Sequence, residues 1–499
     1  MRKENIETSA MLAAIKEESN IAFTENGAVT NLSTLSDCLD LFATAGAMRN
    51  AKEKEIIKRF MRAFAEDKEI AMKTLFFARD IRGGLGERRF FRIIIRELAE
   101  TNPESVIKNI ENIAEYGRCD DILALIGTRC EKEAISYICK ELEEDRKAMN
   151  NGESISLMAK WLPSTNASNK ETVRTAKRIA KAMNMSEADY RKMLSAMRAH
   201  IRIIENNLRK KDYTFAYEEQ PSKALFKYRK AFLRNDEGRY HAFMNKAVRN
   251  PKTLNTSTLV PYDIIVPAMS RKSKPFMPDN ERKVLDATWN ALENYVHSDN
   301  SLVVVDGSGS MYWGATVLPA AVAQSLGIYF AERNKGAFAN HFITFSENPR
   351  LVEIKGKDIF EKVRYCMSFN ECANTNIEKT FDLILQTAVK KNLTQADIPE
   401  RLIIISDMEF DMCAADANVS NFENAKAQFA RYGFTLPKLV FWNVNSRNRQ
   451  QPVTMNEQGV ILVSGMSTQI FAMMKKDELD PYSFMMSILN GKRYANVAA

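Results

Sequence analysis

Histidine, cysteine and long apolar runs are scarce in this 499-residue sequence, and each scarcity argues against a class of protein. The four histidines lie far apart, which leaves little material for histidine-based metal or triad chemistry. The seven cysteines are scattered and include no CxxC pair, so we expect free thiols in a reducing compartment rather than a zinc ribbon or disulfide framework. No apolar run reaches the roughly 18 residues of a membrane helix.

Targeting and catalytic motifs are missing as well. The opening residues MRKENIETSA carry no apolar core of a secretory signal, so we expect a cytoplasmic protein without membrane association. The run Gly83–Gly86 resembles a phosphate loop, but no strand precedes it and no GK[ST] follows. Since we find no nucleophile–base pairing either, we predict that the protein is not an enzyme.

The charge that is present is unevenly distributed. The residues from Ser301 onward hold 20 basic and 20 acidic side chains, so the whole net charge of +8 lies in the first 300 residues. Residues 171–250 alone contain 19 basic and 9 acidic side chains. Such a patch suits phosphate or another polyanion, although a lysine-rich helix face in solvent would have the same composition.

The hydrophobic pattern predicts a multidomain chain with two main parts. Residues 1–50 form a lead-in, and residues 51–250 repeat a 3.6-residue apolar stripe typical of stacked helical hairpins, a HEAT-like α-helical repeat module. The proline-rich residues 251–300 predict an extended connector and a helix at 281–296. In residues 301–499 apolar strands alternate with amphipathic helices, which predicts an α/β domain with a Rossmann-like parallel sheet.

A candidate cation site follows the first of these strands. Asp306, Ser308 and Ser310 lie on one tight loop at the carboxyl end of SLVVV, where α/β domains bind ligands. Carboxylate and hydroxyl oxygens suit a hard divalent cation such as Mg²⁺ or Mn²⁺. The alternative is that these side chains only cap the next helix.

This DxSxS pattern resembles the metal-ion-dependent adhesion site (MIDAS) of von Willebrand factor A (vWA) and integrin-I domains. The resemblance implies a threonine ligand in a later loop and an aspartate ligand after the fourth strand. Thr375 and Asp407 stand at the matching places in this sequence. It also implies that the bound cation takes up an acidic residue of a partner protein.

Three blocks of the helical half carry a second resemblance. The segments RDIRGGLGER (79–88), YGRCDD (116–121) and PSKALFKYRKAF (221–232) are similar to a family catalogued as a domain of unknown function coupled to a vWA domain. The first two blocks are also similar to the TROVE module of the Ro autoantigen family. In that family a ring of helical repeats is closed by a vWA domain and binds structured or single-stranded RNA.

The resemblance therefore implies a TROVE-like, RNA-binding ribonucleoprotein component. The candidate RNA-binding residues are basic side chains beside glycines or aromatic rings: Lys223, Lys227, Arg229, Lys230, Arg82, Arg88 and Arg89. An internal role stays open for the glycine-rich block, because Asp80, Glu87, Asp120 and Asp121 could pair with its arginines. Two other functions stay open: a protein adaptor that binds an acidic partner through the cation, and a structural component of a larger assembly.

Overall fold

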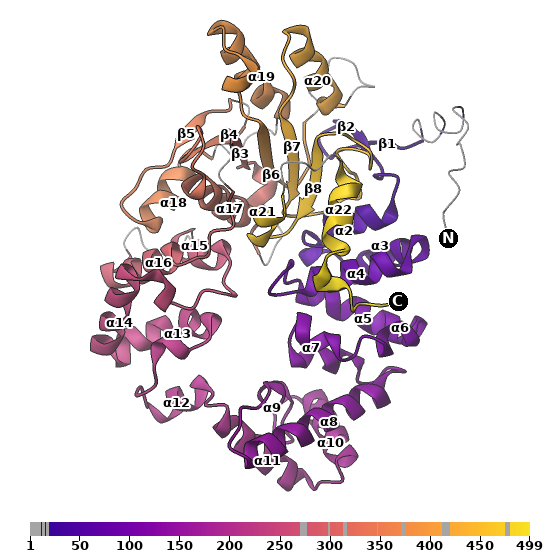
Figure 1. Ribbon diagram of the computed structural model, residues 1–499, viewed down its shortest axis with the longest axis vertical. Coiled ribbons are helices and arrows are strands. Elements are labelled where there is room, and N and C mark those ends of the chain that lie inside the picture. The colour runs from indigo at the N-terminus through magenta and orange to yellow at the C-terminus, as the bar shows by residue number, and fades with distance from the viewer. Residues whose placement is uncertain are drawn as a thin grey trace.

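A ring of helices, closed by an α/β domain, is the main feature of the computed structural model (Figure 1). The structure describes residues 11, 15, 19–269, 277–297, 300–312, 317–346, 348–370, 376–411, 420–474 and 480–499. No helix within these ranges is long and apolar enough to cross a membrane. The predicted fold class, a helical module joined to an α/β domain, is confirmed.

The helices of the ring follow one another in chain order. The first arm contains α2 (Asp37–Thr44), α3 (Glu53–Glu66), α4 (Lys68–Arg79), α5 (Arg88–Thr101), α6 (Pro103–Ile107) and α7 (Asn112–Tyr116). The far side contains α8 (Glu131–Asn150), α9 (Met158–Trp161), α10 (Lys170–Ala182) and α11 (Glu187–His200). The returning arm contains α12 (Ile204–Lys210), α13 (Ser222–Asn235), α14 (Glu237–Arg249), α15 (Pro261–Met269) and α16 (Asp279–Asn290).

The α/β domain is built on a six-stranded sheet of order β5-β4-β3-β6-β7-β8. Its strands are β3 (Ser301–Asp306), β4 (His341–Phe345), β5 (Leu351–Glu353), β6 (Arg401–Ser406), β7 (Lys438–Asn443) and β8 (Val460–Ser464). All are parallel except β5, which pairs antiparallel with β4 at the edge. The helices of this domain are α17 (Pro319–Arg333), α18 (Ile359–Met367), α19 (Ile377–Lys390), α20 (Asn421–Arg431), α21 (Gln469–Met473) and α22 (Pro481–Leu489).

The two faces of the sheet belong to different hydrophobic cores. Side chains alternate along each strand, so Leu302 and Val304 join the core under α19 and α20, while Val303 and Val305 point the other way. That second face shares one continuous core with α2–α5 and the helices as far as α11. The α/β domain therefore has no separate core on this side, and it is fused to the first arm of the ring. Helices α12–α14 and α16 form a smaller core of their own.

Two contact regions close the ring. On the first arm, the backbone of Gly46 lies so near β8 that an added Cβ would be 2.7 Å from the Ser464 carbonyl group. On the returning arm, Arg282 of α16 pairs with Asp358 and Glu361 at 2.6 Å. The chain itself runs from α16 into β3, so the second contact region is also covalently linked.

The C-terminal residues fasten the first arm to the α/β domain. After α22, the guanidinium of Arg493 donates to both carboxylate oxygens of buried Asp80, at 2.7 and 3.0 Å. The Tyr494 hydroxyl donates to the Gly83 carbonyl at 3.0 Å, and its ring stacks on Tyr116. The RDIRGGLGER segment is thus held by residues more than 400 positions later in the chain.

The structure corrects several details of the sequence interpretation. The proline-rich connector is not extended throughout, because residues 261–269 form α15, which packs on α17. The lead-in contains a hairpin, β1 (Ile21–Phe23) and β2 (Val29–Asn31), that bridges to Asp411 and Gln451 of the α/β domain. Residues 119–125 form a 3₁₀ helix rather than an α-helix, and β5 makes the sheet mixed.

Replacing Arg493 should show how much the C-terminal contact contributes. Arg493→Ala leaves the carboxylate of Asp80 buried without its cation. We expect the free energy of unfolding to fall by about 3 kcal/mol, the lower end for a broken buried pair, because Arg493 itself is 36% exposed. Thermal unfolding followed by circular dichroism measures the change. Lys492→Ala, one residue away, is the control, and equal melting temperatures for the two variants would contradict this role.

Candidate nucleic-acid interface and cation site

A cavity of about 1580 Å³ lies inside the ring. Its lining comes from both arms, from the far side and from residues 466–469 after β8. Ten lining residues are basic and four are acidic. The basic residues are Arg49, Arg79, Arg82, Arg88, Arg118, Lys160, Arg202, Lys210, Lys223 and Lys227. The acidic residues are Glu205, Asp212, Glu219 and Glu293. The cavity therefore has a clear excess of positive charge.

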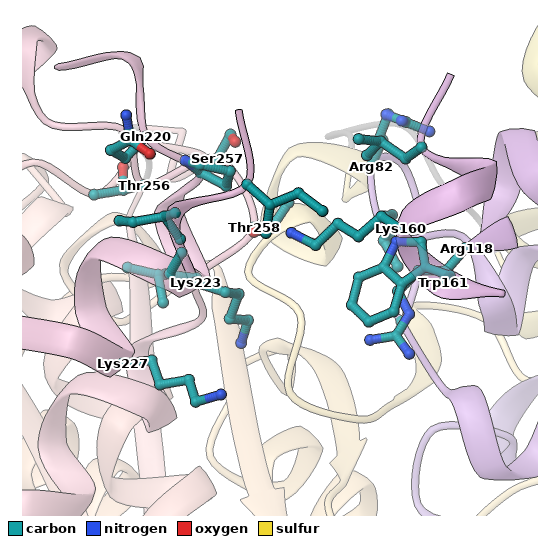
Figure 2. Close-up of a pocket in the computed structure, with 18 of the residues that line it drawn as sticks. Arg82, Arg118, Lys160, Trp161, Gln220, Lys223, Lys227, Thr256, Ser257 and Thr258 are labelled. Atoms are coloured by element: carbon teal, nitrogen blue, oxygen red, sulfur yellow. The ribbon is translucent and has the colours of Figure 1, made fainter. Parts of the chain in front are cut away.

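One wall combines cations with an indole ring. Figure 2 shows Arg82, Arg118, Lys160 and Trp161 on this side. The guanidinium of Arg118 lies 3.8 Å from the centre of the Trp161 ring, and the Lys160 ammonium lies 5.3 Å from it. Trp161 is only partly buried, and its ring lies on a surface that faces the cavity, with these two cations beside it.

The opposite wall carries lysines and hydroxyl groups. Lys223 and Lys227 lie four residues apart on α13, so they share one face of this helix. Figure 2 shows both on the same side of the cavity as the polar segment Thr256–Thr258 and Gln220. The Lys227 ammonium lies 4.8 Å from the centre of the Tyr228 ring, and Lys223 pairs with Asp263. A basic and an aromatic side chain therefore lie together on this wall too.

The structure separates the seven predicted RNA-binding residues into two groups. Lys223, Lys227, Arg82 and Arg88 line the cavity. The other three do not, and each has an internal partner: Arg229 and Lys230 pair with Glu281, while Arg89 donates to the carbonyls of Arg49 and Ala51. Arg229 is 9% exposed, and its guanidinium lies over the Phe226 ring. We therefore leave these three out of the candidate surface.

The acidic residues of the glycine-rich region have internal partners. Asp121 accepts from Arg79 at 2.7 Å and from Arg92 at 2.6 Å, and Asp120 accepts from Arg118. Glu87 pairs with Arg49, as Asp80 does with Arg493. The glycines serve packing as well, since a Cβ on Gly84 would lie 2.1 Å from the Phe77 carbonyl oxygen. The acidic residues of the glycine-rich block, and some of its arginines, therefore have the internal role that the sequence left open.

Arg82 and Arg88 differ from those arginines. Both are exposed on the cavity, and neither has a carboxylate partner among the ion pairs of the described residues. Burial, together with the positive charges of Arg118 and Arg92, lowers the pKa of Arg88. The two neighbouring guanidinium groups add positive potential at Arg88, which an anion would relieve.

The predicted cation ligands meet at the carboxyl ends of two adjacent parallel strands. Asp306 ends β3 and Asp407 follows β6, and the two strands pair directly. The Ser308 amide donates to Asp306 Oδ1 at 2.8 Å, and the Ser308 and Ser310 hydroxyl oxygens are 3.1 Å apart. Ser310 also donates a hydrogen bond to Asp407. Four of the five predicted ligands are thus in one place, whereas Thr375 lies outside the described residues.

Both carboxylates of this site are almost fully buried, at 1% and 2% exposure. Burial, and then the negative charge of Asp407, raise the pKa of Asp306, against the hydrogen bonds from Ser406 and Ser308. Burial also raises the pKa of Asp407, although Arg447 counteracts this. Two neighbouring buried carboxylates need more positive charge nearby than one partly exposed arginine supplies.

The donor set suits the predicted hard cation. Two carboxylates and two hydroxyls supply only oxygen atoms, the ligands that Mg²⁺ and Mn²⁺ prefer. Within the described ranges, no group of three or more His, Cys, Asp or Glu side chains is arranged so that it could hold a metal ion, so the hydroxyls are a necessary part of this set. Gly307 lies between the ligands, where a Cβ would be 2.8 Å from the Asn370 amide oxygen.

Three residues at this site escaped the sequence interpretation. Ser406 donates to Asp306 Oδ2 at 2.6 Å, and its place directly before Asp407 was a usable signal. Arg447 pairs with Asp407 and with Glu25, each at 3.0 Å. These two come from a loop after β7 and from the N-terminal hairpin, and no local pattern connects them to the DxSxS loop.

A sequence model described as "Domain of unknown function (DUF2828)" matches residues 24–125 and 134–302, which is more than half of the chain. The chain belongs to the DUF2828 family. The predicted membership in a family catalogued as a domain of unknown function is thereby confirmed. A second model, "Domain of unknown function (DUF7788)", matches residues 300–484, which contain all strands of the six-stranded sheet and the candidate cation ligands.

Two individual proteins are similar to this DUF2828 chain over most of its length. The uncharacterized protein L728 of Acanthamoeba polyphaga mimivirus is 29% identical, over 94% of this chain and 87% of that protein. The crystal structure of the Deinococcus radiodurans RO (RSR) protein is similar over 90% of this chain and 93% of that one. With 13% identity and a TM-score of 0.43, this second likeness carries no functional argument.

The buried pair of carboxylates predicts an unusual response of stability to pH. Because the pKa of Asp306 is raised in the folded protein, its ionisation costs stability as pH rises from about 4, the ordinary value, through the raised pKa. Asp306→Asn removes that cost. In the presence of a chelator, we expect the melting temperature of the variant, relative to that of the wild type, to increase between pH 5 and pH 8. A relative melting temperature that decreases over this interval would contradict the raised pKa.

Proposed function

We propose that this DUF2828 protein binds single-stranded RNA in the cavity of its ring. The observation that carries the proposal is the excess of basic side chains, together with aromatic rings, around one cavity. Phosphates are bound by arginine and lysine, and unstacked bases are bound on aromatic faces. The two kinds of group occur together on the cavity walls.

The cations that could contact phosphates are those without a carboxylate partner. Among the described lining residues these include Lys160, Arg202, Lys210 and Lys227, besides Arg82 and Arg88. They come from the first arm, the far side and the returning arm. A bound strand would therefore be contacted from several directions, and its affinity would depend strongly on salt.

The rings on the walls favour a single strand over a duplex. Trp161, Phe215, Tyr228 and Tyr295 all line the cavity. A side chain can stack only on a base that has left its neighbours, and in a duplex the bases are stacked on each other. The hydroxyl and amide groups of Gln220 and Thr256–Thr258 supply hydrogen-bonding partners for a ribose 2′-hydroxyl, which distinguishes RNA from DNA.

Charge removal inside the cavity tests this function. The variant Lys160/Lys210/Lys227→Gln removes three positive charges from the lining, and the matched control Lys170/Lys181/Lys192→Gln removes three exposed lysines that do not line it. Binding of a fluorescent oligouridine is measured by anisotropy over a range of salt concentrations. We expect the cavity variant to bind at least about tenfold more weakly, and its salt slope to decrease by about 2 because each phosphate contact contributes about 0.7.

The control should retain wild-type affinity within about threefold, since its lysines are outside the cavity. Equal losses in the two variants would mean that only net charge matters, and would contradict binding in the cavity. Oligothymidine and a duplex RNA of the same length should both bind more weakly than oligouridine.

We also propose that Asp306, Ser308, Ser310 and Asp407 hold Mg²⁺ or Mn²⁺, with Thr375 as the expected fifth ligand. When bound, the cation would supply the positive charge that the two buried carboxylates lack. None of the four described ligands lines the RNA cavity, so the cation would act on the α/β domain rather than on the RNA. Because both carboxylates are buried, we assign the cation a stabilising role.

Addition of Mg²⁺ should therefore raise the melting temperature. At millimolar Mg²⁺ and a hundredfold excess over the dissociation constant, the gain would be about 2.7 kcal/mol. Asp306→Asn should remove the response, and Asp382→Asn, a partly buried aspartate of α19 outside the site, should keep it. Differential scanning fluorimetry measures both. A response that survives in Asp306→Asn would show that Mg²⁺ binds elsewhere.

A further inference from the structure

The candidate cation site already contains a positive charge from the protein itself. The guanidinium of Arg447 lies 3.0 Å from Asp407 Oδ2, while the backbone amide of Glu409 lies 3.3 Å from Oδ1. Both oxygens of this predicted ligand are thus engaged by protein donors. A divalent cation that takes an oxygen of Asp407 has to compete with the guanidinium for it.

Arg447 has a second carboxylate within reach. Its other terminal nitrogen lies 3.0 Å from Oε2 of Glu25, which belongs to the loop between β1 and β2. Glu25 is about half exposed, whereas Asp407 is buried. A guanidinium presents several donors in a fixed plane, so it can weaken one of these pairs and keep the other.

The loop that carries Arg447 is fixed from two sides. On the ring side, Arg449 donates to both carboxylate oxygens of Glu55 of α3, at 2.8 and 3.0 Å, and Arg59 donates to the Asn448 carbonyl at 3.2 Å. On the hairpin side, the Asn448 amide donates to Glu25 at 3.0 Å and to Glu409 at 2.9 Å. The position of Arg447 beside Asp407 is therefore determined by contacts with both the ring and the hairpin.

We propose that Arg447 is the built-in counter-ion of the cation site, and that Glu25 holds it when a divalent cation replaces it at Asp407. The inference rests on the cation site proposed above. Without a divalent cation, Arg447 partly neutralises the buried carboxylate, which would otherwise be strongly destabilising. With the cation bound, the guanidinium keeps Glu25 as its partner. Arg447 and Glu25 then set the affinity of the site in opposite directions.

Mn²⁺ binding to the full chain tests this competition, with the free ion measured by electron paramagnetic resonance. Arg447→Gln removes the competing charge, and we expect Mn²⁺ to bind about tenfold more tightly, within the usual range for coupled binding. Glu25→Gln should weaken binding, because Arg447 then has Asp407 as its only carboxylate. In the Arg447→Gln background, Glu25→Gln should have a much smaller effect.

Two further variants serve as controls. Arg447→Lys keeps the charge and should bind Mn²⁺ much like the wild type, which also guards against misfolding of Arg447→Gln. Arg449→Gln removes a neighbouring arginine that pairs with Glu55, and it should change the affinity by less than about threefold.

The outcomes distinguish this inference from the proposed cation site. If the wild type binds Mn²⁺, Asp306→Asn does not, and Arg447→Gln binds no more tightly than the wild type, the counter-ion role is wrong and the site stands. If the wild type binds no Mn²⁺ and Arg447→Gln does not bind it either, both the site and the counter-ion role are wrong.

Discussion

The ring depends on one face of the sheet, whose apolar side chains share a core with the first helices. Val303, Val305 and Trp442 belong to the same buried cluster as Phe42 and Phe77 of α2 and α4. Burial of apolar surface stabilises the contact between the sheet and the first arm, but it does not set the direction of that arm. The close approach at Gly46 and the C-terminal contacts fix the orientation of the first arm. The returning arm is fixed by the ion pairs of Arg282 and by the chain itself. Without this closure the two walls would not face each other.

Charge in the molecule is divided between structure and surface. The arginines nearest the buried carboxylates, such as Arg79 and Arg493, neutralise them and so support the first arm. Those without a carboxylate partner among the described residues, such as Arg82 and Arg88, are exposed on the cavity. The same residue type therefore has two roles in this region, and Arg118 combines them, because it pairs with Asp120 and also lines the cavity. At the proposed cation site negative charge is in excess instead, because two buried carboxylates have one guanidinium, that of Arg447, beside them.

The sequence was most informative where a residue's role depends on its neighbours along the chain. The alternation of apolar strands and helices predicted β3, β4, β6, β7 and β8, and strand-end positions brought Asp306 and Asp407 to one edge. The sequence was misleading where a residue's structure or role depends on a partner far away in the chain. Proline content suggested an extended connector, yet packing on α17 supports a helix at Pro261–Met269. Arg229 looked like a surface cation, but Glu281 and the Phe226 ring keep it buried. Arg447 and Glu25 lie 422 positions apart, and only the fold places them together.

The central claim is that a single strand of RNA occupies the cavity between the two walls. The most direct measurement is ultraviolet cross-linking of an oligouridine to the wild-type protein, with the attached peptides mapped by mass spectrometry. The account predicts cross-links on both walls, at Lys160–Trp161 and at Lys223–Tyr228, in the same preparation. Cross-links confined to exposed lysines outside the ring, such as Lys170 and Lys181 of α10, would contradict it.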